Sequence, residues 1–141
     1  MLVNFCGDSF LRYNTPESWC VQLADMLDAK PIGFGASGSA FEHAIKTFDP
    51  AADLTIFCWT EANRLYHPKT PINAARADKY HKNNLFYYAA HLYYKYIHQP
   101  ELAVEQQARQ LYWFDETQLS QYAGKCVHLW SFKETHKFRH G

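Results

Sequence analysis

A short apolar segment that ends in a turn of small or polar residues occurs three times in the first 64 residues, and it is the feature that most constrains the fold. The three segments and their turns are 2–6 with 7–9, 30–34 with 35–39, and 54–59 with 60–64. Apolar runs of this length that stop at turn residues are typical of buried parallel strands. We therefore expect an α/β fold in which these strands are covered on both faces.

The stretches between these segments carry the start signals of helices. Thr15 is suited to an N-cap and Pro16 to a first turn, which predicts a helix over residues 16–29. A second helix is expected over residues 40–48, after a turn rich in Gly and Ser. Strand, turn and helix therefore alternate along the chain, as they do in parallel sheets.

The second half of the chain predicts two long helices and one more strand. Residues 74–98 and 101–122 have helical spacing with a proline between them, Gly124 is suited to a C-cap, and residues 126–132 form an apolar run. The element order predicts a three-layer, flavodoxin-like domain with a parallel sheet of about four strands, the third strand central, and helices on both faces. We expect this single domain to occupy residues 1–141.

The length and charge of the chain exclude several classes of function. The chain has 141 residues, of which 48% are apolar, so one core can form without disulfides or a metal ion. Lys and Arg (14) balance Asp and Glu (14), which excludes a protein that needs an excess of cationic residues to bind nucleic acid or anionic membranes. No apolar run approaches the roughly 20 residues that span a bilayer, and no leader of basic and then apolar residues opens the chain. We expect a cytoplasmic protein without membrane or nucleic-acid partners.

Cysteine and histidine usage predicts no cofactor. The four widely spaced cysteines are Cys6, Cys20, Cys58 and Cys126. Because three of them fall in expected strands, we expect buried, reduced thiols rather than disulfides or a metal site. The histidines are too scattered along the chain to predict a ligand set, and only His91 and His98, seven residues apart on one helix face, are placed to pair. We expect neither a metal ion nor another cofactor.

Residues suited to acyl transfer follow the first three expected strands. Because ligands of an open parallel sheet bind at the carboxyl ends of its strands, we expect Ser9, Gly38 and Asn63 to share one edge. A serine hydroxyl can act as a nucleophile, while backbone N–H groups and an Asn amide can stabilise an oxyanion. The turn segments are Gly-Asp-Ser at residues 7–9, Ala-Ser-Gly-Ser at 36–39 and Trp-Thr-Glu-Ala-Asn-Arg at 59–64. In order and spacing they resemble the first three sequence blocks of the SGNH hydrolases, also called the GDSL esterase and lipase family.

This resemblance implies hydrolysis of a small-molecule ester or acetyl ester. Ser9 would be the nucleophile, and the N–H groups of Ser9 and Gly38 would hold the oxyanion. Asn63 or, in its place, Thr60 would be the third donor, and Asp8 would shape the turn that carries Ser9. The residues expected to contact the substrate are Asp8, Thr60 and His67.

The general base is the part of the predicted site that departs from the family pattern. Members of the family carry an Asp-x-x-His motif near the C-terminus, where the His takes the serine proton and the Asp orients it. The last third of this chain has no such motif, so the chain is either a fragment of a longer protein or a shortened version of the pattern. His136, with Glu134 nearby, is the residue expected to act as the base.

Two other functions fit the same sequence. A domain without its base would act as a catalytically inactive binding or assembly module. A flavodoxin-like domain of another kind would use residues 35–39 to hold a phosphate at a helix N-terminus, although that turn lacks a lysine.

Residues 85–97 are aromatic or apolar on nearly every side of the expected helix. A half-exposed helix has one apolar face, so this helix should be covered on more than one side. It would pack between the sheet and the following helix, form a surface through which the chain assembles into a homo-oligomer, or offer tyrosines for stacking against a sugar or a base.

Overall fold

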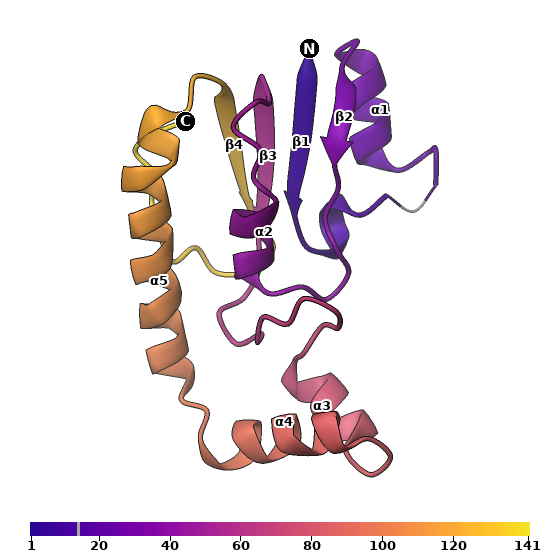
Figure 1. Ribbon diagram of the computed structural model, residues 1–141, viewed down its shortest axis with the longest axis vertical. Helices are drawn as coiled ribbons and strands as arrows, with labels where there is room; N and C mark the ends of the chain where they lie inside the picture. Colours follow the sequence, from indigo (N-terminus) through magenta and orange to yellow (C-terminus); the bar gives the residue numbers. More distant parts are fainter. Residues whose placement is uncertain (14) are drawn as a thin grey trace.

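A four-stranded parallel sheet in the order β2-β1-β3-β4 forms the centre of the computed structural model, which describes residues 1–13 and 15–141 (Figure 1). The strands are β1 (Leu2–Gly7), β2 (Lys30–Gly33), β3 (Leu54–Trp59) and β4 (Lys125–Trp130). β1 and β3 are the two inner strands, and their near-continuous burial explains why their sequences are apolar apart from the buried Asn4 and Thr55. The predicted parallel α/β sheet and the central position of the third strand are therefore confirmed.

Helices cover both faces of this sheet, which gives the expected three layers. On one face, α1 (Trp19–Met26) packs Cys20 and Ala24 against β1 and β3. On the other face, α2 (Phe41–Thr47) and α5 (Pro100–Thr117) pack against the opposite sides of the same two strands. The order of strands and layers is that of flavodoxin-like domains.

The layer between the sheet and α5 is built from aromatic rings. Phe57 and Trp59 on β3 are fully buried, and their rings stack with centroids 4.7 Å apart. Phe114 of α5 meets the Phe57 ring edge-on at 5.6 Å. The indole N–H of Trp59 donates to Nδ1 of His128 on β4 at 3.0 Å, and Phe138 stacks on the His128 ring at 3.7 Å. We call these five rings the aromatic core.

β4 is an edge strand with one open side. It pairs with β3, and within the described residues no other strand pairs with its outer edge. Val127 lies beside Ile56 in the register, so it points to the face that α1 covers, yet Val127 and Leu129 are exposed there. The helix α1 therefore leaves the β4 side of that face open to solvent.

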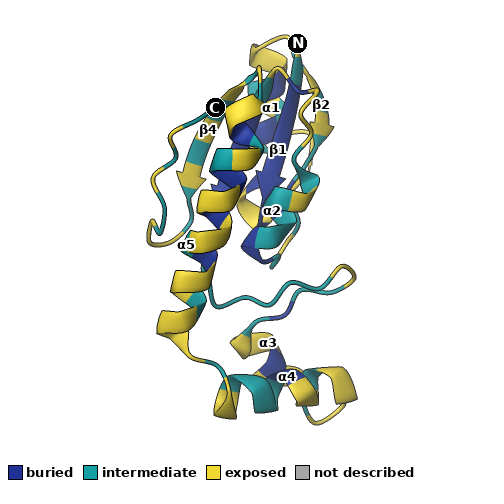
Figure 2. Ribbon diagram, turned by 60° about the vertical axis from the view of Figure 1, so that its left-hand side comes forward, coloured by how far each residue is buried: buried dark blue, intermediate teal, exposed yellow. Residues whose placement is uncertain are grey.

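Two helices, α3 (Ala74–Tyr80) and α4 (Leu85–Tyr96), form a helical hairpin beyond the carboxyl ends of the strands (Figure 1). The single helix predicted over residues 74–98 is therefore wrong. The chain turns before α4, where the side chain of Asn84 accepts the N–H of Phe86 and caps the new helix. The hairpin does not lie between the sheet and α5, and most of its residues are exposed or only half-buried (Figure 2).

Two other helix boundaries differ from the prediction. The first turn near Pro16 closes as an isolated turn, so α1 begins at Trp19. The helix α5 ends at Thr117, well before Gly124, because the chain then turns through a short 3₁₀ helix that buries Leu119 in the core. With these bounds, no helix in the described part of the chain has both the length and the apolar composition needed to cross a membrane.

The four cysteines are packing residues. Their thiols are unpaired, and Cys6, Cys58 and Cys126 lie in β1, β3 and β4, as predicted. Burial raises the pKa of the Cys6 and Cys126 thiols to about 12. Thiols with such a pKa stay protonated at neutral pH and are poor nucleophiles, so these side chains act as small apolar groups.

Candidate active site

The loops that follow β1 and β2 meet at the carboxyl edge of the sheet. The carbonyl oxygen of Gly7 accepts hydrogen bonds from the N–H of Ala36 at 2.9 Å and from the hydroxyl of Ser39 at 3.1 Å. The N–H of Gly35 donates to the carbonyl of Leu11 at 2.9 Å. These bonds join the loop that carries the predicted nucleophile to the loop that carries the predicted oxyanion donor.

Two glycines make this junction sterically possible. A Cβ atom at Gly35 would lie 2.3 Å from the carbonyl oxygen of Asp8, a distance that no larger residue tolerates. Gly38 has a φ of +73°, in the left-handed region that side chains rarely adopt, and a Cβ there would lie 2.9 Å from Cβ of Pro71. Gly35 therefore allows the two loops to pack closely, and Gly38 allows the chain to turn.

Arg64 ties the loop after β3 to the other two. Its Nη1 atom lies 3.7 Å from Oδ2 of Asp8 and 3.4 Å from the carbonyl oxygen of Ser39, while its Nε donates to Glu61 at 3.1 Å. Asp8 itself is buried, and its Oδ1 accepts the N–H of Phe10. The Asp8 carboxylate thus shapes the turn, as predicted, and Arg64 is a cross-link for which the sequence offered no signal.

Ser9 stands exposed at the start of a short 3₁₀ helix that follows β1. Within the described residues its hydroxyl takes part in no hydrogen bond, and the backbone N–H groups of Ser9 and Gly38 meet no acceptor. An exposed hydroxyl and unpaired N–H groups at one sheet edge are the elements that attack on a carbonyl carbon requires.

Of the other two predicted donors, the Asn63 side chain is engaged elsewhere, whereas the Thr60 hydroxyl is buried without a partner in the described residues. Oδ1 of Asn63 accepts from Nε2 of His98 at 3.0 Å, and the Asn63 carbonyl accepts from the hydroxyl of Tyr94 at 2.8 Å. His98 therefore contacts Asn63 rather than pairing with another histidine. Thr60 is buried, and its carbonyl accepts from the side-chain amide of Gln107 at 2.8 Å. Asn63 is thus joined to the helical hairpin, and Thr60 to α5.

His136 has a carboxylate partner on α5. Its Nε2 atom lies 3.2 Å from Oδ2 of Asp115, which is fully buried and also accepts two backbone N–H groups of the C-terminal segment at 2.8 and 3.1 Å. The partner is therefore Asp115, and not Glu134 as the sequence suggested. β3 separates β4 from β1, and in the described residues the hydroxyl of Ser9 is not a hydrogen-bond partner of His136.

A small cavity of about 140 Å³ opens beside Gly38, between the start of α2 and residues 65–71. His67, expected to contact substrate, lines it, and its Nδ1 accepts the N–H of Lys69 at 3.3 Å. His43 also lines it, with a buried Nε2 that has no partner in the described residues. Burial lowers the pKa of His43, so its imidazole is neutral at pH 7 and able to accept a proton. Ser9 is not among the lining residues.

Comparisons of this chain with models of known protein families, with curated proteins and with solved structures find no match. A function must therefore be inferred from the chemistry of the carboxyl edge and from the order of its motifs.

Proposed function

We propose that the carboxyl edge of the sheet is a serine-esterase site of the SGNH-hydrolase type, which acts on a small ester or acetyl ester. The observation that supports this proposal is the junction of two loops through the Gly7 carbonyl, where the hydroxyl of Ser9 and the N–H groups of Ser9 and Gly38 have no hydrogen-bond partner among the described residues. In the proposed reaction Oγ of Ser9 attacks the ester carbonyl carbon. The two N–H groups hold the oxyanion, and the alcohol leaves with the serine proton, so that the acyl group remains on Ser9. Water then attacks this acyl-serine, which releases the carboxylic acid and restores the hydroxyl.

The proposed reaction needs a group that takes the proton from Ser9. His136 with Asp115 has the chemistry of a base and its orienting carboxylate, but its hydrogen bonds lead to α5. His43 lines the cavity beside Gly38, and its Nε2 has no partner in the part of the chain that the structure describes, which makes it the second candidate for the base. Both are tested directly by substitution.

The test is labelling with a fluorophosphonate and hydrolysis of p-nitrophenyl acetate by the 141-residue chain. We expect the label on Ser9, with Ser9→Ala abolishing it and the neighbouring Ser37→Ala leaving it intact. If His136 is the base, His136→Ala removes turnover by a factor on the order of 10⁴, and His43→Gln does not. Labelling that survives Ser9→Ala contradicts the proposal.

A catalytically inactive binding module is the second candidate function. It is favoured by one observation: in the described part of the chain, no imidazole contacts the hydroxyl of Ser9. Such a module would bind a small acyl compound at this edge without turning it over. Acetate titrations followed by NMR signals of Gly35 and Gly38, together with turnover no higher than that of Ser9→Ala, would favour the module over the esterase.

A further inference from the structure

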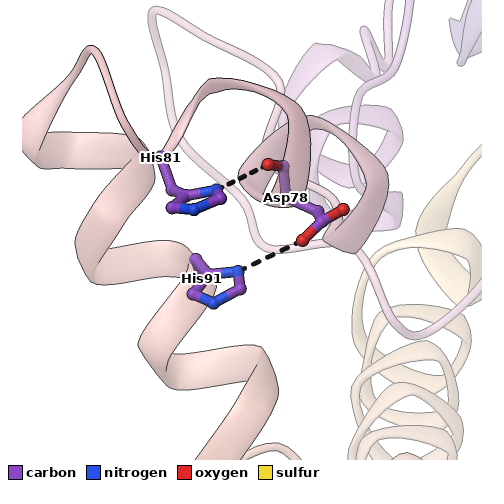
Figure 3. Close-up of side chains that lie close together, drawn as sticks. All are labelled: Asp78, His81 and His91. Atoms are coloured by element: carbon purple, nitrogen blue, oxygen red, sulfur yellow. Dashed lines mark hydrogen bonds and ion pairs between the residues drawn. The ribbon is translucent and has the colours of Figure 1, made fainter.

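Three side chains of types that can ligate a metal ion, Asp78, His81 and His91, lie close together in the helical hairpin (Figure 3). Asp78 lies on α3, His81 directly after it, and His91 on α4. One ligand atom from each of the three side chains lies within 4.8 Å of the other two. The sequence did not predict this group, because His81 and His91 meet only through the turn between the helices.

One distance between ligand atoms suits a common ion: Oδ1 of Asp78 and Nδ1 of His91 are 3.6 Å apart. The rings of His81 and His91 stack at 4.4 Å with an angle of 17° between their planes, so one ring must turn out of the stack before both histidines can point a nitrogen at the same ion. Two ligands held about 2.0–2.1 Å from a zinc ion at the tetrahedral angle lie roughly 3.4 Å from each other. Asp78 and His91 are therefore spaced to hold an ion between α3 and α4, and His81 joins them when its ring turns out of the stack.

The hydrogen bonding of His81 prepares it as a ligand. Its Nδ1 lies against the backbone carbonyl of Asp78, and a carbonyl can only accept, so Nδ1 carries the proton. The other ring nitrogen, Nε2, then keeps its lone pair for a metal. Ligating histidines in metal sites are oriented in this way by a backbone carbonyl or a carboxylate.

The charge of Asp78 is also available. Among the described residues its carboxylate has one ion-pair partner, His91, and the ammonium group of the adjacent Lys79 lies over the Tyr80 ring at 5.2 Å. Two imidazoles and one carboxylate form a donor set typical of zinc sites that keep a fourth position for water.

We propose that Asp78, His81 and His91 bind a divalent transition ion of the zinc class, which links α3 to α4. The apolar contacts that hold these helices together are few: the buried residues between them and the preceding loop are Ile72, Ala77 and Ala90. An ion bound across the hairpin therefore stabilises the part of the molecule with the smallest core.

The experiment is calorimetric titration of the full chain with Zn²⁺ at pH 7.5, repeated with Co²⁺ while visible absorption is recorded. We expect one ion per chain with a dissociation constant in the micromolar range, and visible bands of Co²⁺ in a nitrogen and oxygen site. His91→Ala, His81→Ala and Asp78→Asn should each weaken binding at least tenfold. His140→Ala removes a histidine outside the cluster and should leave binding unchanged.

Thermal unfolding separates a lost ligand from a damaged fold. Zn²⁺ should raise the melting temperature of the parent and of His140→Ala, but not that of His91→Ala, whose circular dichroism should match the parent. Equal Zn²⁺ affinity in the parent and all three cluster variants would overturn the proposal, as would a parent that binds no Zn²⁺ at concentrations up to about 100 micromolar.

Discussion

In the aromatic core Phe57, Trp59 and Phe114 are fully buried, whereas on the helical hairpin Leu85 is 83% exposed and Tyr96 is 70% exposed. Both regions are rich in aromatic and apolar residues. The difference comes from their neighbours, because the core lies between a sheet and a helix, while α4 packs mainly against α3 (Figure 2). The number of aromatic residues in a segment therefore does not indicate whether their side chains are buried.

Polar contacts partly replace apolar burial where the hairpin joins the rest of the chain. The hydroxyl of Tyr94 donates to the carbonyl of Asn63 at 2.8 Å and lies 3.3 Å from that of Ile72, and His98 contacts the Asn63 side chain. A hairpin held by a few hydrogen bonds should open at a lower free energy than the sheet. The two regions should therefore respond differently to substitution.

The largest expected effect is the loss of a ring from the aromatic core. Phe57→Ala should lower the free energy of unfolding by about 3–5 kcal/mol, because it leaves a cavity among buried rings. Leu85→Ala should lower it by less than about 0.5 kcal/mol, because that side chain already lies in water. Urea unfolding followed by circular dichroism measures both. Equal losses would mean that α4 is covered in solution and that the contrast between the two regions is wrong.

Acid should weaken the aromatic core through His128. Burial lowers the pKa of His128 from 6.5 to about 4, so between these values the unfolded chain binds more protons than the folded one. The free energy of unfolding should therefore fall as the pH falls from about 6.5 to about 4, by roughly 1–2 kcal/mol because solvent still reaches part of the ring. His128→Gln, whose amide oxygen can accept from Trp59, should lose less. Urea unfolding at pH 7 and pH 4.5 tests this, and equal losses in both proteins would assign the effect to another group.

A smaller effect is expected at the base of the hairpin. Tyr94→Phe removes the hydrogen bonds to the loop carbonyls and should cost about 1 kcal/mol. Amide hydrogen exchange should become faster in α3 and α4, while the amides of β1 and β3 keep their protection. Equal acceleration in the sheet would show that the hairpin and the sheet open as one unit.

The smallest effect on stability is expected on the exposed side of α4. Tyr96→Asp should change the free energy of unfolding by no more than about 0.5 kcal/mol. If this side of α4 joins two copies of the chain, the same substitution should shift the sedimenting species towards the monomer. Trp113→Asp, at an exposed aromatic residue of α5, is the matched control and should leave the species unchanged. An unchanged mass for Tyr96→Asp would exclude α4 as the self-association surface.

The strands were predictable because burial on both faces requires mostly apolar residues, which the sequences of β1 and β3 supply with one polar residue each, Asn4 and Thr55. The break between α3 and α4 was not, because Asn84 caps α4 through its side chain, and neither Pro nor Gly marks the position. The end of α5 was also not predictable, because Leu119 is buried against strands that are distant from it in the sequence.

The sequence was sufficient to predict that the loops of Ser9 and Gly38 lie together, because parallel strands bring the residues that follow them to the same end of the sheet. The partners of polar side chains were not predictable. His136 meets Asp115 across 21 residues, and Asn63 meets His98 across 35. Spacing rules describe neighbours on one helix or strand, and these contacts depend on how separate elements pack.

The hydrogen bond between Trp59 and His128 gives the aromatic core an optical signature. Trp59 is fully buried, Trp130 is half-buried, and Trp19 and Trp113 are exposed, so the fluorescence of Trp59 should lie at the shortest wavelengths. An imidazolium ring quenches indole emission more strongly than a neutral imidazole does. The short-wavelength part of the emission should therefore fade as His128 takes up its proton near pH 4. The fluorescence of the unmodified chain should thus report the charge of the half-buried His128 side chain.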